Sequence, residues 1–531
     1  MRFLSVSLDS FLIEFHDLLE TTHFFRHLQR HHHPAIVDMI PAEKTILIQF
    51  SVFKTTQKQL IAWLSQQHVQ HEHAVQGTEV VISVSYDGED LVQVAELLGV
   101  TTQEVIQRHT QHEWKVAFIG FAPGFGYLNC EQRPFGSIPR LSTPRKRIVA
   151  GSVALAGEYT GVYPKDSPGG WQLIGRTDAS MWDIHRDPPA LLLPGNRVVF
   201  KDTKHVAQVS VPKHITRQDA LQVSESFAPT HSVLKILNTG MQTLVQDRGR
   251  IGKFAVGVGV GGALDSGAMQ DANQCVGNAL NDAVLEILNG GFKAQVQVPI
   301  VMAITGAIST CVIEYADGTV AEVACGQAIA LDAGDIIEIK RPQAGLRNYL
   351  AIRGGVLAEK VLASCSFDTL AELGPKPLSI GDEVAIGQAP KQAVSTQSVP
   401  LRILPQPKDT VVLDVVLGPR ADWFEAKSLE ILLNQLWQVS NDINRVGLRL
   451  QGEVALKRTQ HQELPSEGTV TGALQIPPSG QPVLFMNDHP LTGGYPVIAT
   501  VAKHHLDLVA QIPAGCLIKF NKVSEFMDIN V

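Results

Sequence analysis

The stretch Val149-Ala150-Gly151-Ser152-Val153-Ala154-Leu155-Ala156-Gly157 decides the fold of this chain. Short β-like runs of this kind alternate with Gly and Pro turns from Val116 to Phe200. Glycine and proline are the strongest punctuation of local structure, so this pattern predicts many short strands joined by turns. The 44 glycines and 29 prolines among 531 residues extend that expectation to the whole chain. We therefore predict a mainly β protein with α+β parts.

The flanking segments predict the domain organisation. Residues 1–82 form a small α/β domain, because 45–50 and 80–84 are typical of strands and 58–67 of a helix. Residues 83–212 form the next predicted domain, which is β-rich from Val116 onward. It begins with two helical pieces between 91 and 109, and the second piece starts at a capping box of Thr101 and Glu104. The polar stretch 213–231 is predicted to be a linker. A Gln/Pro/Ser-rich stretch at 387–408 separates two further β-rich parts, 232–395 and 396–531, the latter with a helix at about 421–436.

The bulk composition excludes several classes of protein. The net charge is −8, and no Lys/Arg-dense stretch carries interleaved aromatics, so the features of a nucleic-acid-binding protein are missing. Six cysteines without a CxxC pair indicate reduced thiols in a cytoplasmic protein. The N-terminus begins like a signal peptide, but Asp9 and Glu14 interrupt the apolar run, and no apolar stretch is long enough to span a membrane.

Two patterns resemble binding motifs. His23, His27 and His31 share one predicted helix face, which permits a metal site, but a solvated helix end before Pro34 explains them better because no Cys or carboxylate joins them. Residues 257–262 satisfy GxGxxG, yet their flanks form no convincing βαβ unit, so we do not expect a dinucleotide site. The sequence also lacks GxxxxGK[ST], so any ATP site is not a P-loop.

Arginines stand beside glycine-rich loops in the first half of the chain. The glycine-rich segments are Gly120-Phe121-Ala122-Pro123-Gly124-Phe125-Gly126, Ser167-Pro168-Gly169-Gly170-Trp171 and Gly175-Arg176-Thr177. Arg140, Arg145 and Arg176 lie in or near these segments. Glycine lets a ligand approach the backbone closely, and arginine is the side chain best shaped for bidentate binding of carboxylate or phosphate. A lone arginine is more often a surface charge.

The ordered motifs resemble those of a known family. The first half, most strongly over about 80–202, resembles the B subunit of 5-oxoprolinase and its sporulation-kinase-inhibitor relatives, through Pro123–Phe125, Ala150–Ala154, Gly161–Pro164 and Ser167–Trp171. Residues 232–520 resemble the C subunit of 5-oxoprolinase, through Gln246–Gly249, Gly418–Arg420, Asn444–Gly447 and Thr492–Pro496. The chain departs from the family pattern at 262–265, 363–367 and 488–492. Those departures leave the substrate specificity open.

The resemblance implies a fold, a reaction and a partner. It implies cyclophilin-like β-barrel domains beside the small N-terminal domain, and a component of ATP-dependent 5-oxoprolinase that activates 5-oxo-L-proline by phosphorylation. The separate A subunit of 5-oxoprolinase would complete the ring opening to L-glutamate. ATP with Mg²⁺ is the expected co-substrate, and no biotin is expected on this chain. The expected partners are this A subunit and the small-molecule substrate. No binding to nucleic acid or to a membrane is expected. Whether the chain forms a homo-oligomer stays open.

Candidate site residues follow from the motifs together with this reaction. We expect Asp247, Asp265 and Arg445 to be catalytic, with the two aspartates positioning Mg²⁺ or a base. The expected substrate- or phosphate-binding residues are Arg140, Arg145, Gly151, Ser152, Tyr163, Gly169, Gly170, Trp171, Arg176, Arg353, Gly493, Gly494 and Tyr495. Each aspartate is also explained as an ordinary turn or cap residue.

Two alternatives of other classes remain. The same modules resemble the carboxyltransferase part of urea carboxylase, although this chain lacks a Met-Lys-Met biotinylation motif and an ATP-driven carboxylase domain. A non-enzymatic regulator that binds a histidine kinase is the other alternative. The chain has no Gly/Ser-rich amidase signature, so the older family name of allophanate hydrolase subunits does not imply amidase activity.

Overall fold

The computed structural model describes residues 1–67, 77–141, 145–203, 232–390, 392–400, 402–460 and 462–530. The predicted linker at 213–231 lies outside the described residues. Strands predominate in this described part of the chain, where they form five larger sheets and two small pairs, so the prediction of a mainly β fold with α+β parts is confirmed. One sheet closes into a barrel. The likeness to cyclophilin stays a prediction. No helix among the described residues is long and apolar enough to cross a membrane.

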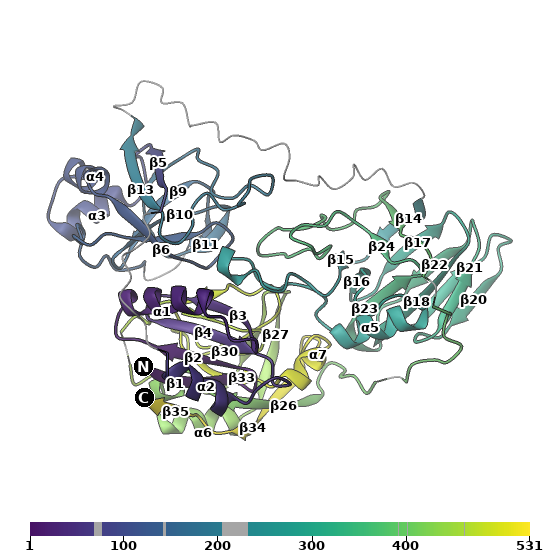
Figure 1. Cartoon of the computed structure of the whole chain (residues 1–531). Helices are drawn as coiled ribbons and strands as arrows, with labels where there is room; N and C mark the ends of the chain where they lie inside the picture. The colour runs from purple at the N-terminus through teal and green to yellow at the C-terminus, as the bar shows by residue number, and fades with distance from the viewer. Residues whose placement is uncertain are drawn as a thin grey trace.

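The N-terminal sheet is antiparallel and has the strand order β3-β4-β2-β1-β35. Its strands are β1 (Arg2–Ser7), β2 (Ser10–Glu14), β3 (Ile36–Pro41), β4 (Thr45–Phe50) and β35 (Asp528–Asn530). Helices α1 (Leu18–Arg30) and α2 (Gln57–Ser65) pack on one face, where Phe25 and Leu60 join the core around Phe11. The edge strand β35 comes from the far end of the chain, so both chain ends belong to one sheet (Figure 1).

The second unit is a seven-stranded sheet with the order β12-β9-β10-β7-β6-β13-β5. Its elements are β5 (Glu79–Val84), α3 (Leu91–Leu98), α4 (Thr102–Gln111), β6 (Trp114–Ile119), β7 (Gly126–Asn129), β9 (Ser152–Ala156), β10 (Tyr159–Val162), β12 (Gln172–Arg176) and β13 (Arg197–Asp202). β8 (Arg145–Ile148) pairs with β11 (Ser167–Gly169) beside it. The glycine-flanked stretch 149–157 supplies β9, whose five residues are all buried. β5, at the expected boundary near residue 82, pairs in parallel with β13 in this sheet.

The third unit combines two sheets around one core. The strands of its seven-stranded sheet are β14 (Ser232–Thr239), β17 (Phe292–Val296), β19 (Cys311–Glu314), β20 (Val320–Val323), β22 (Ile336–Ile339), β24 (Val356–Leu357) and β25 (Glu383–Ile386). The five-stranded sheet has β15 (Gln242–Gln246), β16 (Val284–Leu288), β18 (Ile300–Ile308), β21 (Ala328–Leu331) and β23 (Ala344–Ile352). The short helix η2 (Phe254–Val256) and α5 (Ser266–Cys275) lie in the connection between β15 and β16.

The fourth unit is the closed barrel, in the order β26-β33-β30-β31-β28-β27-β34. Its strands are β26 (Thr410–Leu417), β27 (Trp437–Ile443), β28 (Gly447–Gln451), β30 (Ala473–Gln475), β31 (Val483–Phe485), β33 (Val497–Val501) and β34 (Leu517–Ser524). β29 (Glu467–Gly468) pairs with β32 (Thr492–Gly493). The helical pieces are η3 (Ala421–Trp423), α6 (Ala426–Asn434), η4 (Lys503–His505) and α7 (Leu506–Val509). α6 lies within the predicted helix at 421–436.

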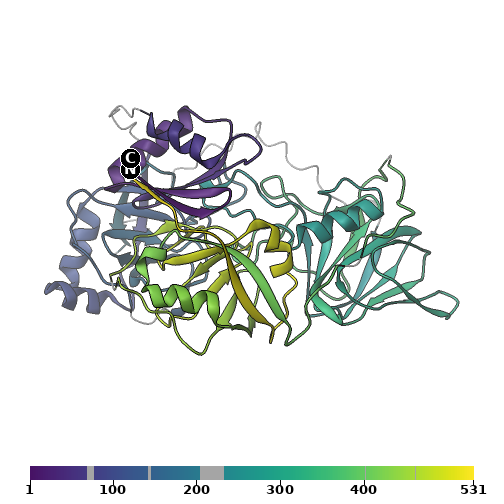
Figure 2. The ribbon, with the colours of Figure 1, turned by 90° about the horizontal axis from the view of Figure 1, so that it is seen from below.

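The N-terminal sheet lies against the barrel in both views (Figures 1 and 2). Strand residues alternate between faces, so the face opposite the two helices presents Leu4, Leu12 and Leu47. These residues pack with Phe254 and Leu491 from the second half of the chain. The two halves therefore share a hydrophobic core, which explains why strands such as β2 and β4 are apolar on both faces.

Candidate functional site

Many of the predicted binding residues meet in one cavity of about 440 Å³ between the two halves of the chain. Loops of the second unit form one side, and loops around β29–β32 of the barrel form the other. From the predicted set, the cavity is lined by Arg140, Tyr163, Gly169, Gly170, Trp171, Gly493, Gly494 and Tyr495. Residues from both halves are thus needed to build this site.

The wall contributed by the first half is aromatic. Phe125 is its centre, with ring centroids 5.2 Å from Tyr163, 5.3 Å from Trp171 and 5.1 Å from Tyr127, all near edge-to-face. This geometry is the favoured one for aromatic pairs and fixes each ring against the next. Burial raises the pKa of the Tyr163 phenol, which therefore stays a neutral hydrogen-bonding group. The cavity offers flat apolar walls to a small ring.

Two arginines from different halves face this cavity. The Arg140 Nε lies 3.6 Å from the carboxylate of Glu463, another residue of the lining. Arg458 donates to the carbonyl of Ile476 and lies over the Tyr495 ring at 5.8 Å. Burial lowers the pKa of Arg458, and no carboxylate among the described residues forms an ion pair with it. The site is therefore suited to an anion.

The glycines of the motifs allow close approach at this interface. A Cβ on Gly494 would lie 2.5 Å from Arg140 Nη1, and one on Gly169 would lie 2.3 Å from the Tyr163 hydroxyl. The Phe121 N–H donates to Thr492 Oγ1 at 2.9 Å and joins the two halves beside the cavity. The sequence motif therefore reflects packing between the halves as well as access for a ligand.

The GxGxxG segment at 257–262 belongs to the same interface. A Cβ on Gly257 would lie 2.6 Å from the Ile119 side chain, and its φ is +78°. Only glycine adopts this conformation readily and lets the loop contact the first half so closely. No strand leads directly into it, since η2 precedes it.

The remaining predicted binding residues lie outside the cavity lining. Arg145 Nη2 lies 2.7 Å from Asp90, and Arg353 donates to the carbonyls of Val276, Pro390 and Gln392. Arg176 is 73% exposed and pairs with Asp87 at 2.8 Å. Gly151 and Ser152 lie at the start of β9, where the Gly151 N–H donates to Tyr163 O and Ser152 Oγ donates to Val149 O. Each of these residues thus has a partner within the chain, although Arg145 Nη1 is buried without a hydrogen-bond partner.

Two of the three residues expected to be catalytic hold loops and helices in place. Asp247 Oδ1 accepts from Ser364 and Ser366 at 2.6 Å, and its Oδ2 accepts from the Cys365 N–H at 2.7 Å. Asp265 caps α5 by accepting from the Ala268 N–H at 2.8 Å. The structure therefore places both aspartates away from the cavity, with their oxygens engaged.

Arg445, the third, is buried between the third and fourth units. It pairs with Asp488 at 2.9 Å and with Glu286 at 2.5 Å, and it donates to Gly262 O at 2.7 Å. Removing one member of such a group leaves an unpaired buried charge, so the network fixes how the two units meet. This part of the Asn444–Gly447 motif has a packing explanation.

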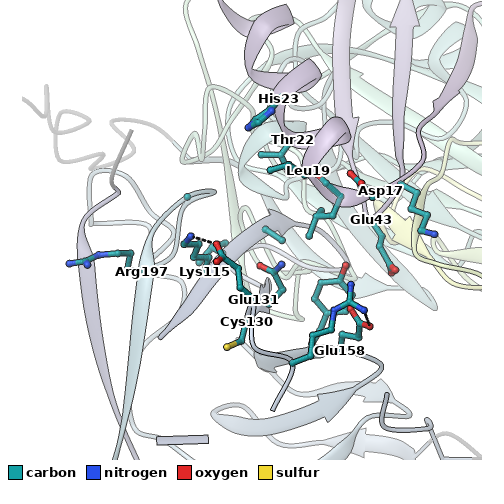
Figure 3. Close-up of a pocket in the computed structure, with 18 of the residues that line it drawn as sticks. Asp17, Leu19, Thr22, His23, Glu43, Lys115, Cys130, Glu131, Glu158 and Arg197 are labelled. Atoms are coloured by element: carbon teal, nitrogen blue, oxygen red, sulfur yellow. Dashed lines mark hydrogen bonds and ion pairs between the residues drawn. The ribbon is translucent and has the colours of Figure 1, made fainter. Parts of the chain in front are cut away.

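A second, larger cavity of about 1050 Å³ lies between α1 and the second unit (Figure 3). Its charges neutralise one another: Lys115 pairs with Glu131 at 2.7 Å, and Arg133 pairs with Glu158 at 3.0 Å. This cavity therefore lacks the surplus of positive charge that an anionic substrate needs.

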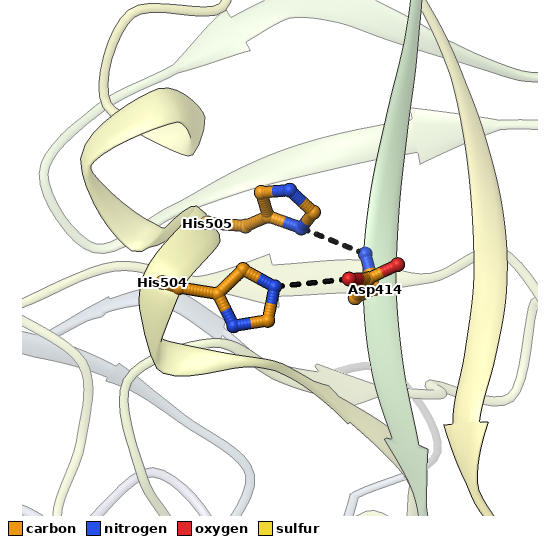
Figure 4. A group of neighbouring side chains, drawn as sticks. All are labelled: Asp414, His504 and His505. Carbon is orange, nitrogen blue, oxygen red and sulfur yellow. Dashed lines mark hydrogen bonds and ion pairs between the residues drawn. The ribbon is translucent and has the colours of Figure 1, made fainter.

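One group of side chains has the composition of a metal site. Asp414, His504 and His505 bring one ligand atom each to within 4.8 Å of one another (Figure 4). His505 Nδ1 accepts the Asp414 N–H at 2.9 Å, so its other nitrogen holds the proton in the neutral ring. His504 Nε2 contacts the Asp414 carboxylate at 2.9 Å, and Asn521 donates to the same carboxylate at 2.7 Å. These bonds tie η4 to β26 and leave His505 without a free ligand atom.

The histidines of α1 are also explained locally. α1 ends at Arg30, and His31 caps it by donating its N–H to the His27 carbonyl. The two imidazoles stack with centroids 4.4 Å apart.

Several cavity residues were not predicted. Three of them are aromatic residues within or beside a glycine-rich motif, namely Phe121, Phe125 and Tyr127. Their spacing around the glycines of that motif could have indicated that they line a binding site. Arg458 and Glu463 belong to no motif, and no pattern in the sequence places them opposite the first half.

Comparison with known proteins agrees with this two-part construction. Residues 1–192 match the family model "Carboxyltransferase domain, subdomain C and D", and residues 256–522 match "Carboxyltransferase domain, subdomain A and B". The chain is 37% identical to the C subunit of Escherichia coli 5-oxoprolinase over 302 residues, which cover 55% of this chain and 92% of that protein. It is 35% identical to the B subunit of Bacillus subtilis 5-oxoprolinase over 184 residues, covering 32% of this chain and 75% of that protein.

A solved structure extends the likeness to nearly the whole chain. The crystal structure of TTHA0988 superposes with a TM-score of 0.80 at 29% identity, covering 96% of this chain and 99% of that one. The chain thus belongs to the family of carboxyltransferase-domain proteins that includes the B and C subunits of 5-oxoprolinase, and it carries a B-like and a C-like part in one polypeptide.

Proposed function

We propose that this chain is the fused B–C component of an ATP-dependent 5-oxoprolinase and that 5-oxo-L-proline binds in the cavity between the two halves. The likeness of both halves to proteins named as 5-oxoprolinase subunits supports this function. The observation that carries it is the cavity of about 440 Å³, which is lined by aromatic rings and by Arg140 and Arg458 from different halves.

The substrate's chemistry matches this lining. 5-Oxo-L-proline is a small, nearly flat lactam with one carboxylate. A flat ring packs well against fixed aromatic side chains, and a carboxylate is the anion that a guanidinium binds best. A cavity of about 440 Å³ is within the size range of small-molecule sites.

The proposed reaction needs ATP because a lactam carbonyl is a poor electrophile. Amide resonance is strong, with a rotation barrier of roughly 18–20 kcal/mol. Transfer of the γ-phosphoryl group to the lactam oxygen forms a new P–O bond, breaks the bond to ADP and makes the ring carbon open to attack by water. The products are L-glutamate, ADP and phosphate. We propose that the ring opening is completed by the separate A subunit of 5-oxoprolinase.

Mg²⁺ is expected to accompany ATP as part of the co-substrate. Asp247 and Asp265 do not fit the role of its ligands, because their oxygens are engaged by the chain's own donors. The residues of this chain that act in the proposal are those that bind and orient the lactam.

The test is reconstitution of the purified chain with the A subunit, using 5-oxo-L-proline labelled with ¹⁸O at the lactam carbonyl. We expect L-glutamate only when the A subunit is present together with ATP, and ¹⁸O should appear in the released phosphate. Unlabelled phosphate would contradict phosphorylation of the lactam oxygen. Full turnover by this chain alone would contradict the need for the A subunit.

A carboxyltransferase of a biotin system is the second candidate, because both family models carry that name. A biotin-dependent reaction would give carboxyl transfer from carboxybiotin without any 5-oxo-L-proline-dependent ATP use. Incubation of the chain with carboxybiotin and urea, with release of free biotin as the readout, decides between the two. Streptavidin blotting of the chain should be negative under either function if biotin is carried elsewhere.

A further inference from the structure

The cavity contains an arrangement of charge that the family likeness does not assign. Arg140 and Arg458 lie next to two consecutive residues of the second half, Gly494 and Tyr495. Arg140 Nη1 lies 2.5 Å from the place of a Cβ on Gly494, and Arg458 lies over the ring of Tyr495. Both arginines contact the same short loop and line the same cavity.

Arg458 is held in position without neutralisation of its charge. Its Nη2 donates to the Ile476 carbonyl, and the Tyr495 ring supports its face at 5.8 Å. A carbonyl and an aromatic ring orient a guanidinium but carry no full negative charge. A positive group oriented in this way at a cavity wall is arranged to receive an anion.

Arg140 has a carboxylate beside it, but the contact is loose. Glu463 lies 3.6 Å from Arg140 Nε, a distance too long for a hydrogen bond, and 59% of the Glu463 side chain is exposed. Exposed pairs of this kind contribute about 0–1 kcal/mol. A ligand carboxylate that makes two short bonds to a guanidinium is held more firmly than this.

We propose that Arg140 and Arg458 together bind the carboxylate of the ligand and that Glu463 occupies Arg140 in the empty site until the ligand displaces it. This inference rests on the proposed function for the identity of the ligand and adds how the ligand is held. It makes Glu463 a competitor of the substrate carboxylate. It also gives the second half of the chain a direct role in binding through Arg458.

The proposal predicts opposite effects for two single variants of the full chain. Glu463→Gln removes the competing charge, so 5-oxo-L-proline should bind about 2–5-fold more tightly by isothermal titration calorimetry. Arg458→Gln keeps a donor for the Ile476 carbonyl but loses the charge, so binding should weaken by roughly 30-fold. Neither variant should change the affinity for 5-oxo-L-prolinamide by more than about twofold, because the amide has no carboxylate to exchange.

Matched controls are Glu453→Gln and Arg449→Gln, two exposed residues of the same barrel outside the cavity. Both should leave the affinity unchanged. Weaker binding by Glu463→Gln would overturn the displacement, and unchanged binding by Arg458→Gln would overturn the shared clamp. Because Glu463 is exposed, its variant tests the proposal even if Arg458→Gln folds poorly.

A second probe separates this inference from the proposed function. If the wild-type chain binds succinate but not 5-oxo-L-proline, the proposed substrate is wrong. The same opposite effects of the two variants on succinate binding would then still support the clamp. Absence of binding by either carboxylate would overturn both.

Discussion

At the scale of single residues, the distinction between a binding arginine and a structural one depends on its partner. Arg145 and Arg140 stand in the same motif, yet Arg145 forms a close ion pair with Asp90 at 2.7 Å, whereas the contact of Arg140 with Glu463 is loose at 3.6 Å. The sequence predicted both as anion ligands because it shows residue type and not the partner across the fold. Glycine density was a better guide, since Gly169, Gly170 and Trp171 do line the cavity.

Arg140 and Arg176 provide the test of this distinction. Arg140→Ala should lower kcat/KM in the reconstituted enzyme by the equivalent of about 2–5 kcal/mol, because a substrate carboxylate loses its charged partner. Arg176→Ala removes an exposed pair with Asp87 and should change stability by under about 0.5 kcal/mol, with kcat/KM near that of the wild type. Steady-state kinetics and melting temperatures of both variants show which arginine binds the substrate and which one is structural. A large loss of kcat/KM in Arg176→Ala alone would restore the sequence-based prediction for that residue.

At the scale of elements, the strongly patterned segments were predictable. The strand expected at 45–50 is β4, the helix expected at 58–67 overlaps α2, and Thr101 does cap α4 through the Glu104 N–H at 3.2 Å. The sequence left two roles open for Asp265, a catalytic carboxylate and a turn or cap residue, because the two look the same in sequence. Only the structure shows that its partners are Ala268, Arg402 and Gln511.

The cap of α5 predicts a dependence on pH. Burial, with a smaller contribution from the Asp507 carboxylate, raises the pKa of Asp265 to about 6 despite the nearby Arg402. The unfolded value is about 3.9, so the folded chain binds the proton more tightly between the two values. The stability that this proton contributes is complete below about pH 4 and is lost as the pH rises through about 6.

Asp265→Asn should therefore flatten the fall in stability across this interval. The measurement is the urea midpoint of wild type and variant at several pH values between about 4 and 7. Because Asn cannot ionise, the urea midpoint of the variant should increase relative to that of the wild type as the pH rises. A difference that stays constant would show that Asp265 does not titrate in this range.

At the scale of the whole molecule, the two halves are joined by a buried ionic group as well as by the shared core. Arg420 of the barrel is 4% exposed and pairs with Glu467 and with Glu14 of the N-terminal sheet. Glu14 in turn pairs with Arg2 at 3.0 Å. Gly418–Arg420 is recognisable in the sequence as a family motif, but no local pattern reveals that Arg420 pairs with a residue 406 positions away. Long-range pairing of this kind escapes any prediction from local patterns.

Removal of Arg420 should be costly for this reason. Arg420→Met leaves Glu467 buried and unpaired, so we expect a loss of about 3–5 kcal/mol, measured as a lower urea midpoint. The double variant Arg420→Met/Glu467→Leu should recover most of that loss, because no lone charge then remains in the interface. Arg449→Met, which removes an exposed pair with Asp442, is the control and should have almost no effect. An Arg420→Met variant as stable as this control would show that the pair does not join the halves.

The pairing of β1 with β35 also means that the order of the two parts along the polypeptide could be changed by circular permutation. Arg2 lies opposite Asn530 in the register of that sheet, so the two ends of the described chain are neighbours in space. A short peptide joining residue 531 to residue 1 would close the polypeptide into a ring without moving a strand. New ends could then be opened between residues 203 and 232, outside any described strand, giving a circular permutant in which the C-like part comes first and the same interface cavity is assembled.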